Sequence, residues 1–121
     1  MKSFKTLVLV IGLLFAFQAG IAQSDKSVRN IRTNIQITKV NGVCDMCKKR
    51  IEHAALSVNG VRSAAWDKGT KILTLKYDLL KQEAPDNVER KIASLGHDNE
   101  NYKADDKAYT ALPYCCHYRK M

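Results

Sequence analysis

The sequence has 121 residues, of which 45% are hydrophobic and 26% are charged, with a formal net charge of +8. This length fits one small domain with a modest core and excludes a large active-site cavity. Because the lysines are spread along the whole chain, we interpret the basic charge as solubility and steering toward an acidic partner or an anionic surface, and not as nucleic-acid binding.

The first 22 residues have the pattern of a secretory signal peptide. Two lysines precede an apolar run over residues 7–17, and small residues follow up to Ala22, after which we expect cleavage. The apolar run is too short to cross about 30 Å of hydrocarbon as a retained anchor. The residue directly after the cleavage point is Gln23 and not a cysteine, so no lipid anchor is expected there. The mature protein is therefore expected to be soluble and periplasmic or secreted.

The mature part of the chain contains every cysteine of the sequence. Outside the cytoplasmic membrane, unprotected thiols tend to become disulfides, so either disulfides or metal ligation could occupy these side chains. Four cysteines allow three pairings, and the sequence does not choose among them. The cysteines are Cys44, Cys47, Cys115 and Cys116.

Residues 31–40 are predicted to form the first strand, after a flexible polar lead-in over residues 23–30. Apolar and polar residues alternate along IRTNIQITKV, and this period of two is typical of a half-buried strand. Asn41 and Gly42 break the pattern and begin a loop that holds Cys44. One side of the strand carries Ile31, Thr33, Ile35 and Ile37.

The first helix is predicted over residues 46–58. Its apolar residues recur at helical spacing and indicate one buried stripe. Asn59 and Gly60 supply the left-handed turn that ends many helices. The stripe consists of Cys47, Ile51, Ala54, Ala55 and Val58.

A hairpin, a second helix and a weak strand follow. VRSAAWD and KILTLKYD both alternate, and the short connection through Gly69 favours a hairpin. Pro85 suits the first turn of a helix that Gly96 ends. HDNENYKA has poor strand propensity, and it is assigned to a strand mainly because the sheet needs an edge. The inward residues of this part are Leu73, Leu75 and Tyr77 on the strand, and Val88, Ile92 and Leu95 on the helix.

The predicted order is strand, helix, strand, strand, helix, strand. This order predicts an α+β fold of the ferredoxin-like βαββαβ type, with a four-stranded antiparallel sheet covered on one face by two helices. We assign residues 31–104 to this domain and residues 105–121 to a C-terminal tail. The DDKAYTAL part of the tail can form one or two helical turns before Pro113.

With these elements, residues 31–104 resemble the heavy-metal-associated domain family, which includes small metal carriers and the metal-binding modules of metal-pumping ATPases. The most specific match is Gly42-Val43-Cys44-Asp45-Met46-Cys47, although Val43 replaces the methionine that is usual before the first cysteine. With its leader, the chain is most similar to the periplasmic mercury-binding and copper-carrying members. The resemblance implies a protein that sequesters a metal ion or transfers it by thiolate ligand exchange, and whose partner is a metal transporter or another metal-binding domain. It does not extend to Cys115 and Cys116.

The spacing of Cys44 and Cys47 independently suits a soft metal ion. One cysteine ends a loop and the other begins a helix, so both sulfurs can meet at the edge of the domain. Thiolates select Cu(I), Hg(II), Zn(II) or Cd(II) over Mg(II) or Ca(II). The partial positive charge at the helix N-terminus stabilises thiolates. The basic residues 48–50 either add to this positive field or form an ordinary solvated face of the helix. Two thiolates satisfy linear Cu(I) or Hg(II), whereas structural Zn(II) normally has four ligands.

Histidines and the two cysteines of the tail are further candidate ligands. His97 follows Gly96 in the loop that, in the family, approaches the metal loop, so it is either an accessory ligand or a surface histidine. His53 lies on the exposed helix face, and no metal role is expected for it. Cys115 and Cys116 could complete a three- or four-sulfur site with Cys44 and Cys47, form disulfides with them, or make a second site with His117. Trp66 and the tyrosines of the tail are expected to be packing residues.

Two other functions compete with metal binding. A CxxC pair at a helix start is also the thioredoxin arrangement, but no tryptophan precedes Cys44, no proline occupies the position of the cis-proline of that fold, and the order of elements differs. A disulfide-stapled interaction module is conceivable for so small a core, although a bridge across three positions constrains little chain. No nucleotide loop, nucleophile triad or paired-carboxylate motif occurs, so we do not expect an enzyme.

Overall fold

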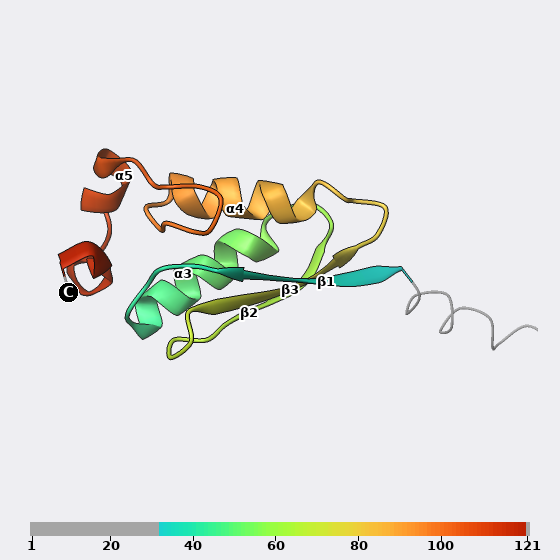
Figure 1. Cartoon of the computed structure of the whole chain (residues 1–121), viewed down its shortest axis with the longest axis horizontal. Helices are drawn as coiled ribbons and strands as arrows, with labels where there is room; N and C mark the ends of the chain where they lie inside the picture. The colour runs from blue at the N-terminus through green and yellow to red at the C-terminus, as the bar shows by residue number, and fades with distance from the viewer. Residues whose placement is uncertain (1–31, 121) are drawn as a thin grey trace, which may run out of the picture. The chain divides into compact units, whose positions relative to one another are not determined.

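The structure, a computed structural model, describes residues 32–120. The predicted signal peptide and lead-in, residues 1–22 and 23–30, lie outside the described residues. Figure 1 shows a sheet with two helices on one face and a C-terminal segment at one end. Within residues 32–120, no helix is both long and apolar enough to cross a bilayer.

The sheet has three antiparallel strands in the order β1-β3-β2. Its strands are β1 (Thr33–Lys39), β2 (Val61–Trp66) and β3 (Ile72–Asp78). Leu73 of β3 lies opposite Thr38 on one side and Trp66 on the other, and all three side chains are buried. This row across the sheet forms the floor of the core next to the loop that carries Cys44. The predicted inward residues of β3, Leu73, Leu75 and Tyr77, are confirmed as buried.

The alternation in β1 suggested that its isoleucine side faces the core, but this side is exposed. Ile35 and Ile37 are 61% and 59% exposed, on the face of the sheet without helices. Thr38 and Val40 lie on the other face and are buried. Because residues at even spacing share one face of a strand, the burial of Thr38 and Val40 forces the two isoleucines outward.

Both predicted helices form and pack on one face of the sheet (Figure 1). The first is α3 (Asp45–Leu56), which buries Cys47, Ile51, Ala54 and Ala55 as predicted. The second is α4 (Ala84–Ser94), with Pro85 in its first turn and Val88 and Ile92 buried. Val58 lies beyond the end of α3 and is only half-buried, and Leu95 is 36% exposed, so these two do not join the core stripes.

The predicted fourth strand does not form. In residues 97–104, the only pairing with the described sheet is an isolated bridge between Val40 and Asn99. Side chains in this segment bond to their own backbone instead: Asn99 Oδ1 accepts from the N–H groups of Asn101 and Tyr102, at 3.2 Å and 3.0 Å. Such local bonds compete with a strand ladder. The described fold is therefore α+β with three strands and two main helices, and the complete ferredoxin-like sheet is absent from residues 32–120.

The C-terminal segment, residues 105–120, is ordered as three short helical pieces. The predicted helical turns before Pro113 form as α5 (Asp106–Thr110), capped by Asp105 Oδ1, which accepts from the Ala108 N–H at 2.6 Å. Two 3₁₀ turns follow, Tyr114–Cys116 and Tyr118–Lys120. Tyr109, Leu112 and Cys116 belong to the same buried cluster as the residues of the helices and the sheet. The segment is thus part of the core.

Candidate metal centre

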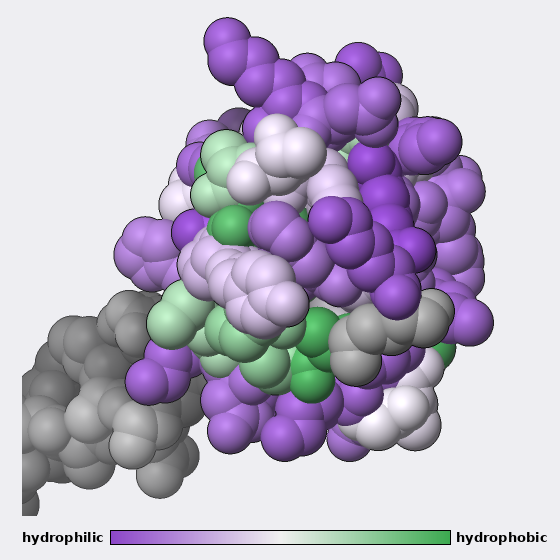
Figure 2. Space-filling view, turned by 90° about the vertical axis from the view of Figure 1, so that its left-hand side faces the viewer, coloured by the Kyte–Doolittle hydropathy of each residue, from purple (hydrophilic) through white to green (hydrophobic). Residues whose placement is uncertain are grey.

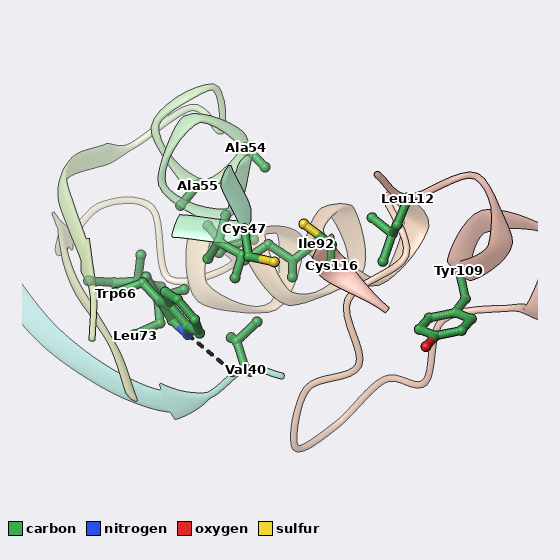
Figure 3. Close-up of a cluster of buried hydrophobic side chains, with 13 residues drawn as sticks. Val40, Cys47, Ala54, Ala55, Trp66, Leu73, Ile92, Tyr109, Leu112 and Cys116 are labelled. Atoms are coloured by element: carbon green, nitrogen blue, oxygen red, sulfur yellow. Dashed lines mark hydrogen bonds between the residues drawn. The ribbon is translucent and has the colours of Figure 1, made fainter. Parts of the chain in front are cut away.

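The loop that carries Cys44 is shaped by a close approach at Gly42. A Cβ atom at Gly42 would lie 3.0 Å from the Cβ of Cys47 and 3.1 Å from the ring of Trp66. Only glycine lets the loop pass this close to the indole without displacing it. Trp66 is fixed in turn because its Nε1 donates to the Val40 carbonyl at 3.0 Å (Figure 3). The core residues therefore set the path of the loop from β1 into α3.

Cys44 and Cys47 occupy the start of α3 with different exposure. Cys44 is the N-cap residue and is half-buried, whereas Cys47 lies one turn inside the helix and is fully buried. Their sulfurs are 3.2 Å apart. This confirms the geometric expectation that a loop cysteine and a helix cysteine meet at the edge of the domain.

The tail brings its two cysteines to the same point. Cys44 Sγ lies 2.9 Å from Cys115 Sγ and 3.4 Å from Cys116 Sγ, and all four cysteines carry free thiols. We call Cys44, Cys47, Cys115 and Cys116 the cysteine cluster. Cys115 is exposed, whereas Cys116 is fully buried and its sulfur points toward that of Cys47 (Figure 3). The tail therefore folds back onto the CxxC pair, as both a shared metal site and a disulfide with that pair require, and the thiols are free in this structure.

His97 is buried and faces the cluster. It is only 1% exposed, so it is not a surface histidine. Its Nδ1 lies 2.8 Å from the Asn41 carbonyl, which can only accept, so Nδ1 carries the proton. Burial lowers the pKa of this imidazole, which keeps the ring neutral at neutral pH. Nε2 is then a bare lone pair, and it has no hydrogen-bond partner among the described residues.

The potential ligand atoms fall into two groups of three. Cys44, Cys115 and Cys116 form one group, and Cys47, His97 and Cys116 form the other, with ligand atoms within 4.8 Å of one another in each. The second group is entirely buried. Neither group includes a carboxylate, so the donors are thiols and one imidazole. These donors suit soft and borderline metal ions and not Mg(II) or Ca(II).

Sequence reasoning missed the residues that hold the tail in place. Arg119 donates to both carboxylate oxygens of Asp98, at 3.1 Å and 2.8 Å, and to the Ala104 carbonyl at 2.7 Å. Its guanidinium also lies over the ring of Tyr109, 4.4 Å from the centroid. Arg119 and Asp98 are 21 positions apart, and no local pattern links them. These bonds connect the end of the tail to the segment after His97.

Tyr118 makes a second connection between the tail and the His97 segment. Its hydroxyl donates to the Gly96 carbonyl and accepts from the Asp98 N–H, both at 2.8 Å. Its ring stacks on the imidazole of His97, with centroids 5.9 Å apart. The expectation that this tyrosine packs is thus correct, and it packs against a candidate ligand.

The other histidines lie away from the two ligand groups. His53 is exposed near the end of α3, as predicted. His117 directs Nε2 to the Leu112 carbonyl at 3.0 Å and stands beside Tyr109. Neither belongs to a ligand group within residues 32–120. A second site built on His117 therefore has no support in the geometry.

The pKa values of Cys44 and Cys116 are shifted in opposite directions. Burial raises the pKa of the Cys44 thiol, but hydrogen bonds from Cys115 and Cys47 outweigh burial and lower that pKa to about 7. Burial raises the pKa of Cys116, and its hydrogen bonds with Cys47 and Cys44 raise it further. Of these two thiols, the half-buried Cys44 is therefore the one that forms a thiolate near neutral pH.

The acidity of Cys44 predicts its reactivity in the metal-free, reduced protein. Alkylation by iodoacetamide, followed peptide by peptide with mass spectrometry, should show a midpoint near pH 7 for Cys44, below the ordinary value of about 8.5. The rate should fall as the pH drops below 7, because the thiol is then protonated. In Cys115→Ala, which removes one hydrogen-bond donor, the midpoint should rise. A Cys44 midpoint at or above 8.5 in the unmodified protein would contradict the geometry of the cluster.

Comparison with known proteins identifies one family. The model of the heavy-metal-associated domain matches residues 37–98, just over half of the chain. The chain is similar to the CopZ metallochaperone, with 28% sequence identity and a TM-score of 0.52, over 55% of this chain and 100% of that one. It is also similar in fold to the N-terminal domain of a potential copper-translocating P-type ATPase from Bacillus subtilis in its Cu(I)-loaded state. That match has 19% identity and a TM-score of 0.51, and covers 61% of this chain and 92% of that one. The comparison with curated proteins found no match.

Proposed function

The chain belongs to the heavy-metal-associated domain family, and from this premise we propose that it binds one soft metal ion at Cys44 and Cys47 and transfers it by thiolate exchange. The observation that carries the proposal is the meeting of the two sulfurs, 3.2 Å apart, at the start of α3. Cys44 is only half-buried and its pKa is lowered to about 7, so it can make the first bond to an incoming ion. Cys47 then provides a second sulfur from a fixed helical position.

Cu(I) is the ion that we favour, with Hg(II) and Zn(II) as alternatives. The likeness to the CopZ metallochaperone supports the handling of a metal ion. Thiolates are soft ligands that select Cu(I), and a donor set rich in sulfur also suits Hg(II) and Zn(II). Transfer requires only that sulfurs of a partner replace those of this protein one at a time, with no catalytic step. The partner we propose is a metal transporter or another metal-binding domain, and the location we propose, from the leader over residues 1–22, is outside the cytoplasmic membrane.

The end of the molecule that carries the cysteine cluster offers a surface for such a partner. Figure 2 looks onto this end and shows hydrophobic surface near its middle with hydrophilic residues around it. Tyr114 is 92% exposed and Met46 is 50% exposed, and they flank Cys115 and Cys47 in the sequence. A partner that contacts this end would bring its own sulfurs close to Cys44 and Cys115.

A double substitution tests the function. The reduced Cys44→Ser/Cys47→Ser variant should lose tight binding of Cu(I), measured by competition with a chromophoric Cu(I) chelator under anaerobic conditions, because hydroxyls are poor ligands for this ion. The matched control is Ser57→Ala/Ser63→Ala, which changes two residues outside the ligand groups and should bind as the unmodified protein does. Undiminished stoichiometry and affinity in the cysteine variant would remove the proposal.

Thiol–disulfide exchange is the second candidate function. The lowered pKa of Cys44 favours it, since an acidic thiol beside another sulfur is the arrangement that redox proteins use. If the reduced protein binds none of Cu(I), Hg(II) and Zn(II) tightly, this function takes the place of metal transfer.

A further inference from the structure

The tail places two adjacent cysteines on opposite sides of the cluster. Cys115 is exposed and lies 2.9 Å from Cys44 Sγ, whereas Cys116 is fully buried and shares the core with Cys47. A thiol with no catalytic or ligand role can be buried as a small apolar group. Cys116, however, is buried against two other cysteines and an imidazole, and it is the one residue common to both ligand groups.

The lone pair of His97 needs a partner that the protein does not supply. Nε2 is buried and has no hydrogen-bond partner in residues 32–120, although Nδ1 is satisfied by Asn41. Leaving a buried polar atom unsatisfied costs about 1–3 kcal/mol. A neutral imidazole with one nitrogen bonded to a carbonyl and the other bare is the state in which histidine ligates metals. The bare nitrogen lies with Cys47 Sγ and Cys116 Sγ, all within 4.8 Å of one another.

These contacts do not suit a linear, two-coordinate ion between Cys44 and Cys47. Cys44 Sγ already has three other sulfurs within 3.4 Å. An ion bound at a metal–sulfur distance of about 2.3 Å would therefore have the tail sulfurs within reach. Mixed sulfur and nitrogen donors in such numbers suit ions that accept three or four ligands, such as Zn(II) or three-coordinate Cu(I).

We propose that the tail and the His97 segment complete the metal site: Cys47, His97 and Cys116 hold the ion on the buried side, and Cys44 and Cys115 form the exposed side through which it enters and leaves. The proposal rests on the metal-binding function proposed above and adds its coordination. Each thiol that binds gives its proton to solvent, and His97 binds through Nε2 without losing a proton. The ion is then enclosed by ligands from three parts of the chain.

The direct test is X-ray absorption on the unmodified, reduced protein loaded with one equivalent of Cu(I) or of Zn(II). The expected spectrum has at least two sulfur ligands and one imidazole nitrogen. In His97→Gln, the nitrogen contribution should disappear and affinity should fall by about tenfold or more. In Cys116→Ser, a sulfur should be lost with a similar fall in affinity. The matched control is His53→Gln, an exposed histidine outside both groups, which should leave spectrum and affinity unchanged.

The outcomes distinguish the failure of the enclosed site from the failure of the proposed metal-binding function. A linear spectrum with two sulfurs and no nitrogen in the unmodified protein, or a spectrum and affinity unchanged by His97→Gln, would overturn the enclosed site and leave the two-cysteine carrier standing. Failure of the unmodified protein to bind any of Cu(I), Zn(II) and Hg(II) would overturn the proposed function itself. Because the spectrum of the unmodified protein is decisive alone, the test holds even if Cys116→Ser fails to fold.

Discussion

Replacing Trp66 with alanine is expected to lower the free energy of unfolding by about 3–5 kcal/mol. Trp66 is 1% exposed, and it is among the largest fully buried side chains. It packs against Gly42 and donates to the Val40 carbonyl at 3.0 Å. Its removal leaves a cavity under the loop of Cys44 and an unsatisfied carbonyl. Because small domains have about 5–15 kcal/mol of stability in total, the variant should be close to unfolding.

Urea denaturation followed by far-ultraviolet circular dichroism measures this loss. Trp66→Phe keeps one aromatic ring but loses the N–H donor and part of the indole volume, so it should cost less than Trp66→Ala, about 1–3 kcal/mol. The exposed Tyr114, changed to alanine, is the control for a large aromatic residue outside the core and should change stability by less than about 0.5 kcal/mol. A loss below about 1 kcal/mol in Trp66→Ala would mean that the indole does not support the metal loop.

Much of the fold could be predicted from the sequence because its signals are local. The stripe of α3, the proline at the start of α4 and the alternation of β3 each depend on residues a few positions apart. The face of β1 was not predictable in this way. Its alternation is equally regular on both sides, and the burial of Val40, just beyond the strand, decides which side faces the core.

The prediction of a fourth strand was wrong, and the amino-acid composition of the segment shows why. Residues 97–104 are rich in Asn and Asp, and their side chains bond to nearby backbone groups, as Asp98 Oδ1 does with the Ala104 N–H at 2.7 Å. The prediction relied on the need of the sheet for an edge strand and set local propensity aside. Here local propensity prevailed, and the segment became a loop that positions His97 and Asp98.

The candidate site was predictable only in part. The spacing of Cys44 and Cys47 predicted this pair of candidate ligands, because Cys44 ends the loop and Cys47 lies in the first turn of the helix that follows. The position of Cys115 and Cys116 depends on contacts across more than 70 positions, which no pattern in one sequence reveals. One signal was available, however: Tyr109, Leu112 and Cys116 recur at intervals of three and four, which is typical of a buried face.

Arg119→Met is expected to release the end of the tail. Methionine keeps much of the side-chain volume but none of the donors, so Asp98 loses both bonds from the guanidinium and the Ala104 carbonyl loses its partner. With charged hydrogen bonds at about 1.5–3 kcal/mol each before partial exposure is considered, we expect a loss of about 2 kcal/mol. Alkylation of Cys116 in the metal-free protein should become at least tenfold faster, because the tail no longer shields it.

A matched control separates this effect from the loss of any ion pair. Arg90 pairs with Asp86 at 2.7 Å on the surface of α4, where both side chains are about half exposed. Such an exposed pair contributes little, so Arg90→Met should leave stability nearly unchanged and leave the alkylation of Cys116 unchanged. Equal effects of Arg90→Met and Arg119→Met would show that Arg119 does not hold the tail.

The pH dependence of the tail contacts follows from Asp98. Burial raises the pKa of this carboxyl, but the bonds from Arg119 and the Ala104 N–H outweigh burial and lower the pKa below its ordinary value. A group with a lowered folded-state pKa stabilises the fold above its unfolded pKa of about 3.9, and that stability disappears as the pH falls through the folded pKa. The tail should therefore stay attached at neutral and mildly acidic pH.

Hydrogen exchange in the metal-free protein measures this attachment. Exchange of the tail amides should accelerate relative to the amides of α3 only below about pH 4. In Arg119→Met, the tail amides should already exchange fast at pH 7. A tail that is equally protected in both proteins at pH 7 would mean that burial of Tyr109, Leu112 and Cys116 is enough to hold Cys116 at the cluster.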